Sequence, residues 1–182
     1  MSRSAELSGR GVTSMIDCLL FGATILAVLG SGLIGGVFFG FAAFMLKAIA
    51  RLPVPQGIAA MQSITIAIKN SPFLILFFAT AALTGVLALA APFNWSKPGS
   101  AYLLLGSLLF LSFPFGVTLL KNVPLNSRLA TLKPESTDGA SYWLHFRASW
   151  ALWNHLRWLG ALAAMASLLL ALVKRGTPLL LP

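Results

Sequence analysis

The stretch from Leu19 to Leu46 contains no charged side chain, and this feature constrains the fold more than any other. A helix that crosses a bilayer needs about 20 mostly apolar residues, because every backbone N–H and C=O in hydrocarbon must be hydrogen-bonded within the helix. The stretch is too long for the apolar core of a secretory signal peptide, and it lacks a convincing small-residue cleavage site. We therefore interpret it as a membrane-spanning helix.

Three further stretches have the length and apolar character of spans. They run over residues 73–93, 102–120 and 156–173, and Pro114 is expected to kink the middle one. The composition agrees, since 58% of the residues are hydrophobic and the mean hydropathy is +0.87, against roughly 45–50% apolar residues in soluble domains. A chain of 182 residues has room for about four such helices and their loops.

We predict an all-α fold, a bundle of four transmembrane helices formed by residues 19–175 as a single membrane domain. The first span would cover residues 19–46, and residues 1–18 and 176–182 would be terminal tails. Residues 142–155 contain no Pro or Gly, so they are expected to extend the fourth helix as an interfacial segment. The chain is thus predicted to be an integral, multi-pass membrane protein.

The charges exclude several classes of function. The net charge is +9, but the 13 Lys and Arg residues are spread among the ends of the apolar segments. This distribution is typical of loops that face membrane lipids, and it argues against a nucleic-acid partner. The four acids, Glu6, Asp17, Glu135 and Asp138, lie outside the spans, which disfavours a carboxylate-bridged di-iron site and a proton pump with buried carboxylates. Cys18 is the sole cysteine, so neither a disulfide nor a cysteine-based metal site is expected.

The segment Gly30 to Gly35 reads GSGLIG and matches a dinucleotide-binding pattern. That pattern requires a strand before it and a helix after it, whereas this segment lies inside a predicted span. Gly32, Gly36 and Gly40 repeat at four-residue spacing, which produces a smooth helix face that another helix approaches closely. We interpret the glycines as a packing face, which also offers a surface for a homo-oligomer.

Polar side chains that are energetically unfavourable in a membrane, together with large aromatic rings, cluster where the fourth span begins. At 100° per residue, five of them fall within about 40° of one line on the helix: Trp143, Arg147, Trp150, Asn154 and Arg157. Trp153 and His155 lie to either side of that face. One interpretation is an aromatic belt with interfacial arginines. The other is a binding site for a flat aromatic ligand, in which an arginine contacts an anionic or carbonyl oxygen.

The segment NVPLN follows the third span and offers the side-chain amides of Asn122 and Asn126, held by Pro124. An amide donates and accepts hydrogen bonds at once. The third span ends, and the fourth begins, on the same side of the membrane. We therefore expect these amides to face the polar groups of the fourth helix.

Four motifs resemble the anthrone-oxygenase-like membrane family. They are GGVFFGF in the first span, AAMQSI before the second, KNVPLNSRLA after the third and W..F...W..WNHLR leading into the fourth. The resemblance covers about Gly30 to Val173 and implies a small four-helix membrane protein. For the few members with an assigned role, it also implies the oxygenation of an anthrone to an anthraquinone.

Carried over by motif position, the resemblance implies these signature residues: Asn122, Pro124, Asn126, Trp143, Trp150, Asn154, His155 and Arg157. Three positions depart from the family pattern. Phe146 stands where a Tyr is expected, Thr65 where an Asn often follows the Met-Gln pair, and Lys47 where a Pro often ends the first span. The missing phenol at Phe146 removes one candidate acid or hydrogen-bond donor.

These observations lead to the hypothesis of a membrane-embedded oxygenase that acts on a hydrophobic anthrone-type or other phenolic substrate. Deprotonation turns such a substrate into a carbanion that itself reduces O₂, so we expect no metal and no tightly bound cofactor. Catalysis would involve His155 as the general base and Arg157 as the group that stabilises the oxyanion. Substrate binding would involve Asn122, Asn126 and Asn154 at the carbonyl, and Trp143 and Trp150 on the rings.

Two alternatives stay open at this stage. The same features fit a non-enzymatic membrane protein, either an accessory subunit or a carrier of lipophilic molecules, in which the Trp and Arg face binds a partner helix or a lipid headgroup. The second alternative is a haem protein with His145 or His155 as an axial ligand. These two histidines lie roughly 15 Å apart along one helix, so they cannot share one metal ion within a protomer.

Overall fold

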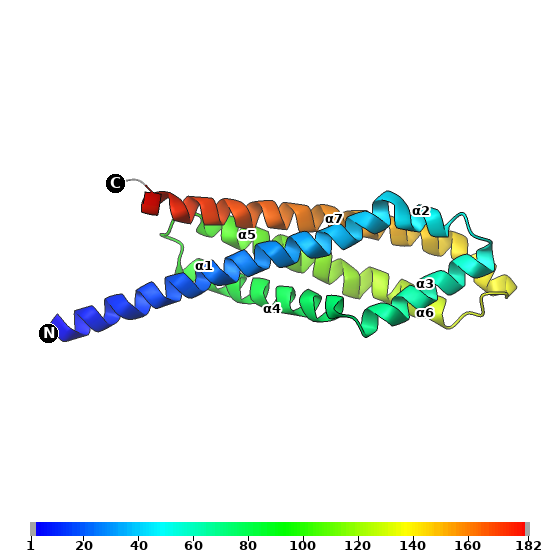
Figure 1. The fold of residues 1–182 in the computed structure, drawn as a ribbon, viewed down its shortest axis with the longest axis horizontal. Helices are drawn as coiled ribbons and strands as arrows, with labels where there is room; N and C mark the ends of the chain where they lie inside the picture. The colour runs from blue at the N-terminus through cyan, green and yellow to red at the C-terminus, as the bar shows by residue number, and fades with distance from the viewer. Residues whose placement is uncertain (1–2, 181–182) are drawn as a thin grey trace.

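Helices account for nearly all of the chain in the computed structural model, which describes residues 3–180 and the side chains of residues 15–176 (Figure 1). No strand occurs among these described residues. Four helical segments are long and apolar enough to cross a membrane: Met15–Ile49, Pro72–Phe93, Ser100–Ala130 and Thr137–Gly176. The predicted all-α bundle of four transmembrane helices is therefore confirmed.

The first half of the chain forms two spans joined by a short helix. The first span is α1 (Arg3–Gly40), which continues through a π-helical turn, η1 (Phe41–Met45), into α2 (Leu46–Ile49). The connecting helix α3 (Val54–Lys69) follows, and the second span is α4 (Pro72–Phe93). Proline at the start of α3 and of α4 suits a first helical turn, because the missing N–H would have no partner there.

The second half forms the other two spans. The third begins as α5 (Ser100–Phe110), continues through the π-helical η2 (Leu111–Asn122) and ends as α6 (Val123–Ala130). The fourth span is part of α7 (Thr137–Leu180), one helix that includes the segment we expected to lie at the interface.

Helix extends into both terminal segments, since α1 begins at Arg3 and α7 continues to Leu180. Charged residues end an apolar stretch without ending a helix, because Arg and Lys are good helix formers. Residues 1–2 and 181–182 lie outside the part of the chain that the structure describes.

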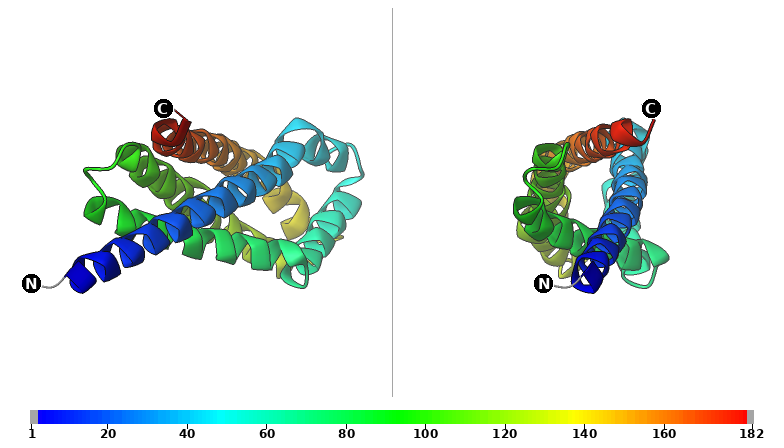
Figure 2. Two further views of the ribbon diagram at one scale, coloured as in Figure 1. Left: turned by 60° about the vertical axis from the view of Figure 1, so that its left-hand side comes forward. Right: turned by 90° about the vertical axis from the view of Figure 1, so that its left-hand side faces the viewer.

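The spans form a bundle in which α7 contacts α1, α5 and η2, while α4 contacts α1, α5 and η2 (Figure 2). α1 crosses the bundle obliquely, and both chain ends lie at the same end of the bundle as the α4–α5 turn. The connections from α2 to α3 and from α6 to α7 lie at the opposite end. The bundle thus has one end that carries the termini and one end built around α3 and α6.

α7 contributes a stripe of buried side chains at the three- and four-residue spacing of a helix. Its members are Trp143, Phe146, Trp150, Asn154, Arg157, Ala161, Ala164, Leu168 and Ala171. The stripe changes from aromatic and polar residues to alanines and a leucine along α7. The small residues allow neighbouring helices to approach closely.

The glycines of α1 take part in this close packing. A Cβ added at Gly32 or Gly35 would lie 3.0 Å from Met165 Sδ or 3.1 Å from Ala161 Cβ of α7. Open space surrounds Gly36, where an added Cβ would meet nothing within 4 Å. At Gly40 an added Cβ would meet only Met45 and Phe44 of the same span, so within the protomer only Gly32 of the predicted face closely contacts another helix. The other close contacts of this segment are at Gly35 and at Gly30, where an added Cβ would lie 2.2 Å from Thr80 Oγ1 of α4.

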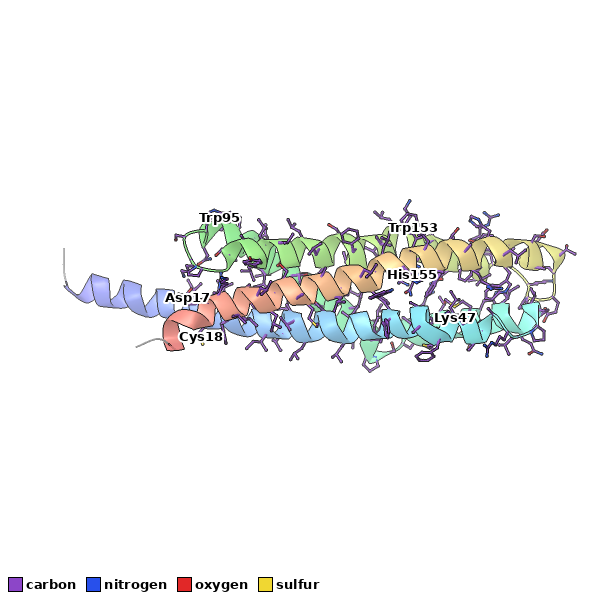
Figure 3. The ribbon with its side chains drawn as sticks, turned by 90° about the horizontal axis from the view of Figure 1, so that it is seen from above. Asp17, Cys18, Lys47, Trp95, Trp153 and His155 are labelled. Carbon is purple, nitrogen blue, oxygen red and sulfur yellow. The ribbon has the colours of Figure 1, made fainter. Side chains whose placement is uncertain are left out.

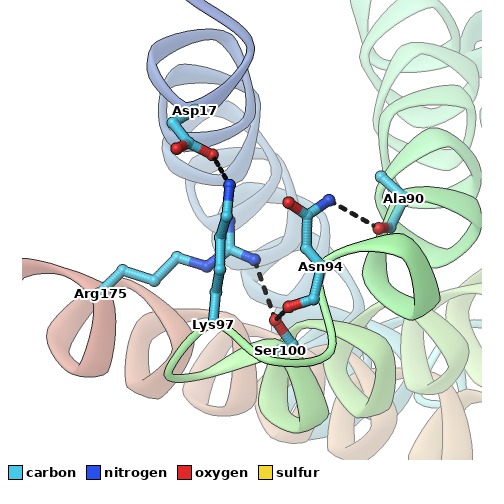
Figure 4. A network of polar contacts seen from close by, with 6 residues as sticks. All are labelled: Asp17, Ala90, Asn94, Lys97, Ser100 and Arg175. Carbon is cyan, nitrogen blue, oxygen red and sulfur yellow. Dashed lines mark hydrogen bonds and ion pairs between the residues drawn. The ribbon is translucent and has the colours of Figure 1, made fainter. Parts of the chain in front are cut away.

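The α4–α5 turn is held against both neighbouring spans (Figure 4). Lys97 forms an ion pair with Asp17 of α1, and Arg175 Nη2 of α7 donates to Ser100 Oγ at 3.3 Å. Gly99 adopts a left-handed conformation, with φ of +82°, and an added Cβ would lie 2.7 Å from the carbonyl oxygen of Ala171. Only glycine suits this turn.

The third span was expected to kink at Pro114. Instead, the helix widens into a π-helix over Leu111–Asn122. Proline has no backbone N–H, so the regular α-helical pattern is interrupted there. Thr118 Oγ1 donates back to the Pro114 carbonyl at 2.5 Å. π-helical segments are rare and often occur at functional sites. This one presents Thr118 and Asn122 to the cavity described next.

Candidate functional site

A cavity of about 210 Å³ lies between α1 and η1, α3, α4, η2, α6 and α7, towards the end of the bundle built around α3 and α6. Its aromatic lining residues are Phe38, Phe41, Phe73, Phe77, Phe78 and Trp150. Its polar lining residues are Thr65, Lys69, Thr118, Asn122, Asn126, Ser127 and Arg157. A mostly apolar cavity with a few polar groups is the usual form of a small-molecule site.

The aromatic wall is a connected set of rings. Phe73 stacks against Phe77 with ring centroids 6.1 Å apart, and Phe38 meets the edge of Phe73 at the same distance. Phe77 in turn lies 5.6 Å from Phe115 behind it. Such rings offer faces and edges to a flat aromatic ligand.

Arg157 supplies the polar end of the cavity, and it is only 5% exposed. Its Nη2 donates to Asn154 Oδ1 at 2.8 Å and its Nη1 donates to Thr118 Oγ1 at 3.3 Å. Its guanidinium carbon lies 4.1 Å from the ring centroid of Phe38 and 5.0 Å from that of Trp150. The cation is therefore fixed by two oxygens and two aromatic rings.

No carboxylate balances the charge of Arg157. Within residues 15–176 the one ion pair joins Lys97 to Asp17, at the far end of the bundle. Arg157 Nε is buried and has no hydrogen-bond partner. Burying a cation without a counter-charge raises the free energy of the folded protein, unless another group places a negative or partly negative atom beside it. The cavity is thus suited to a ligand that brings an anionic or strongly polarised oxygen.

The two amides of the NVPLN segment line the same cavity and contact Trp150 of the fourth helix. Asn122 is buried and its Nδ2 donates to the Trp150 carbonyl at 3.5 Å, while its Oδ1 has no partner. Asn126 Oδ1 accepts a hydrogen bond from Trp150 Nε1 at 3.1 Å. These contacts fix Trp150 against η2 and α6 and leave an unused acceptor on Asn122, which lines the cavity.

Asn154 lies behind Arg157 and does not line this cavity. Its Nδ2 donates to the Phe38 carbonyl of α1 at 2.9 Å, while its Oδ1 holds the guanidinium. Asn154 thus connects α1 to α7 and sets the position of Arg157. This geometry makes it a positioning residue.

The structure separates Trp143 and His155 from the cavity. Trp143 is buried and stacks on Phe146 at 5.6 Å with an interplanar angle of 11°, in a cluster that includes Ile58 and Met61. His155 is exposed on the outer side of α7, where Figure 3 shows it near Lys47 of the neighbouring helix. His155 Nδ1 lies 2.7 Å from the Ala151 carbonyl.

Both histidines lie on the outside of the bundle. His145 is also exposed, with its Nε2 3.5 Å from Ser149 Oγ. No group of three or more His, Cys, Asp or Glu side chains in the described part of the chain is placed to hold a metal ion.

Several contributors to the site were not predicted from the sequence, among them the lining phenylalanines of α4. Thr118 and Phe38 contact Arg157, and Lys69 lines the cavity while remaining exposed, which places it at the mouth. Thr118 had one available signal, since it is four residues before Asn122 and four after Pro114 in the same helix. The contact of Phe38 depends on how α1 crosses α7, which no local pattern indicates.

The fold and the cavity define a class: a multi-pass helical membrane protein with an aromatic-lined internal cavity that ends at a buried arginine. The family profile described as anthrone oxygenase matches residues 73–167, and the chain belongs to this family. The matched residues include α4, the whole third span and most of the buried stripe of α7. Neither the comparison with curated proteins nor the comparison with solved structures finds a match.

Proposed function

We propose that this protein is a membrane-embedded oxygenase that oxidises a flat, hydrophobic anthrone-type or related phenolic substrate with O₂. The observation that carries the proposal is the buried, uncompensated charge of Arg157 at one end of an aromatic-lined cavity. Membership of the anthrone oxygenase family supports the same chemistry. The apolar surroundings suit a substrate that partitions into lipid.

In the proposed complex, the substrate rings lie among the phenylalanines of α4 and the substrate oxygen lies at Arg157. Asn122 and Asn126 provide amide groups beside that oxygen. At about 210 Å³, the cavity is smaller than the roughly 300 Å³ at which pockets for drug-sized ligands begin. This size favours a compact substrate of a few fused rings.

The proposed reaction starts with loss of a proton from the CH₂ group opposite the substrate carbonyl. The electron pair moves into the ring system, and the negative charge reaches the carbonyl oxygen, where Arg157 stabilises it. The carbanion transfers an electron to O₂, and the two radicals combine to form a C–O bond and a peroxide. Loss of water from the protonated peroxide then gives a second carbonyl. Overall, a CH₂ group and O₂ become a C=O group and H₂O.

The proposal includes no tightly bound cofactor, because the substrate carbanion is itself the reductant of O₂. No His, Asp or Glu side chain lines the cavity among the described residues. The positive charge of Arg157 favours the deprotonated substrate, and the proton leaves to water at the mouth beside Lys69. His155, the general base of the sequence-based hypothesis, has no role at the reacting atoms in this mechanism.

The experiment compares Arg157→Gln, Arg157→Lys and His155→Ala with the wild type in lipid nanodiscs. Anthraquinone formation and O₂ uptake are measured together, and empty nanodiscs correct for spontaneous oxidation. We expect Arg157→Gln to lower kcat/KM by about 100-fold or more, the usual effect of removing an oxyanion-stabilising group. Arg157→Lys should retain part of the rate. Equal rates for wild type and Arg157→Gln would contradict the proposal.

His155→Ala is the matched control, because it changes a polar residue of the same helix two positions away. We expect its rate to stay within about twofold of wild type, as for a residue away from the reacting atoms. A loss as large as that of Arg157→Gln would restore His155 as the general base.

A carrier of lipophilic aromatic molecules is the alternative function, favoured by the lack of a carboxylate or imidazole in the cavity lining. Such a protein would bind an anthraquinone stoichiometrically but would not increase O₂ uptake above that of empty nanodiscs. Ligand binding with no turnover would therefore select the carrier.

A further inference from the structure

A second hollow lies on the outer side of the bundle, between the end of the first span and α7. It is a groove of about 550 Å³ with Lys47, Arg147 and His155 in its lining. Figure 3 shows Lys47 and His155 on neighbouring helices at a similar level along the bundle. The groove is distinct from the aromatic cavity and shares none of that cavity's lining residues.

The two cations of the groove are uncompensated. The side chains of Lys47 and Arg147 form no hydrogen bond or ion pair with the described residues, and no acidic side chain lines the groove. Lys47 is exposed and Arg147 is half-buried. Two free cations that share one hollow attract an anion.

His155 adds a third polar group with a defined orientation. A carbonyl oxygen only accepts hydrogen bonds, so the contact between His155 Nδ1 and the Ala151 carbonyl places a proton on Nδ1. Nε2 is then free to accept a hydrogen bond, or to donate one when the ring is protonated. His155 therefore suits a phosphate that carries or lacks a proton.

The rest of the groove is apolar except for Asn154, whose side chain is already hydrogen-bonded to Phe38 and Arg157. Its walls include Ala42 and Leu46 from the first span and Leu144, Ala148 and Ala151 from α7. Small side chains leave a channel between the two helices that a hydrocarbon chain can fill. Lys47 lies near the end of the first span, which ends at Ile49, at the depth where hydrocarbon meets headgroups.

We propose that this groove binds an anionic phospholipid, with its phosphate at Lys47, Arg147 and His155 and one acyl chain along the alanine and leucine wall. Basic pockets between transmembrane helices are known to bind anionic lipid headgroups. A free inorganic anion would use the three polar groups but not the apolar wall. The combination of cations and a hydrocarbon channel favours the lipid.

The test measures lipid retention by the full-length protein with native mass spectrometry. The protein is incubated with equal amounts of phosphatidylglycerol and phosphatidylcholine, which differ in net charge. We expect one phosphatidylglycerol per protein, and Lys47→Gln/Arg147→Gln should weaken its retention by about tenfold or more. The matched control is Arg51→Gln/Lys133→Gln, which removes two exposed charges outside the groove at the same end of the bundle.

Ala148→Leu tests the hydrocarbon channel without a change of charge, and it should also weaken retention of phosphatidylglycerol. Inorganic phosphate at millimolar concentration should leave the bound lipid in place. Equal retention by wild type and by the groove variant would overturn the proposal, as would an equal loss in the control variant. Displacement by inorganic phosphate would assign the groove to a free anion and overturn the lipid assignment.

Discussion

Asn154 Oδ1 accepts a hydrogen bond from Arg157 Nη2 at 2.8 Å, and the two residues lie one helical turn apart on α7. The same asparagine donates to the Phe38 carbonyl of α1. Arg157 is therefore positioned by a neutral residue that leaves its charge in place. This relationship separates two effects that are usually combined, the orientation of a cation and its neutralisation.

Asn154→Asp separates them experimentally. An aspartate keeps an acceptor oxygen at Arg157 but supplies a carboxylate that competes with the substrate oxyanion. We expect kcat/KM for anthrone oxidation to fall by about 100-fold, and to fall by only about tenfold in Asn154→Ala, which loses orientation alone. Steady-state O₂ uptake measures both. If Asn154→Asp were as active as wild type, orientation alone would matter and the free charge would not.

Removal of the buried charge should maintain or raise the Tm of the protein and abolish anthrone oxidation. Replacing a buried charged group by apolar residues of similar volume is often neutral or stabilising by about 1–4 kcal/mol. In the double variant Arg157→Met/Asn154→Leu, no polar atom of the pair remains unpartnered. We expect its Tm in detergent, followed by circular dichroism, to equal or exceed that of wild type, with no oxidation of anthrone.

Arg51→Met is the control for that measurement, because Arg51 is exposed in the turn after α2 and its loss should leave the Tm unchanged. A Tm of the double variant well below that of Arg51→Met would show that the charge of Arg157 is compensated in the free protein.

The hydrogen bond between Trp150 Nε1 and Asn126 Oδ1 should be measurable as a coupling between α6 and α7. In a double-mutant cycle with Trp150→Phe and Asn126→Leu, we expect a coupling energy of about 0.6–1 kcal/mol, as for other hydrogen bonds between membrane helices. Chemical unfolding in mixed micelles provides the free energies. Trp158→Phe is the matched control, since the Trp158 indole N–H has no partner and should show no coupling to Asn126.

Gly160 determines how closely the third span approaches α7. A Cβ added at Gly160 would overlap the Cβ and ring of Phe113, and the Phe113 Cβ cannot swing away because it is bound to the backbone. We expect Gly160→Ala to reduce the free energy of unfolding by about 1–3 kcal/mol. Gly36→Ala, on an open face of α1, should be neutral or slightly stabilising. Equal behaviour of the two variants would show that α7 and the third span can separate without cost.

Helical periodicity accounts for much of what the sequence indicated. Trp150, Asn154 and Arg157 were placed on one face by the rotation of 100° per residue, and in the structure all three are buried together. The span lengths followed from the thickness of the bilayer, because unpaired backbone groups cannot exist in hydrocarbon. These predictions depend only on local geometry and on the solvent.

Other features depend on tertiary contacts and could not be predicted from a local sequence pattern. Trp143 shares the predicted face and the apolar cluster of Trp150, yet it does not line the cavity. Its ring lies against Phe146 and against Gly57 of α3. His155 follows Asn154 by one position, and both line the outer groove, but only Asn154 reaches Arg157. The π-helical course of η2 could not be predicted from Pro114, which also permits a simple kink.

The cavity draws its walls from two parts of the chain with different family relationships. Asn122, Asn126, Trp150 and Arg157 lie within the residues that match the anthrone oxygenase profile, whereas the contributions of α1 and α3 lie before residue 73, where the match begins. Phe38 of α1 contacts Arg157, whereas no hydrogen bond or ring contact among the described residues joins the lining residues of α3 to the arginine. Substitutions in α3 therefore offer a route to change which molecule is accepted while the proposed contact with the substrate oxygen is kept.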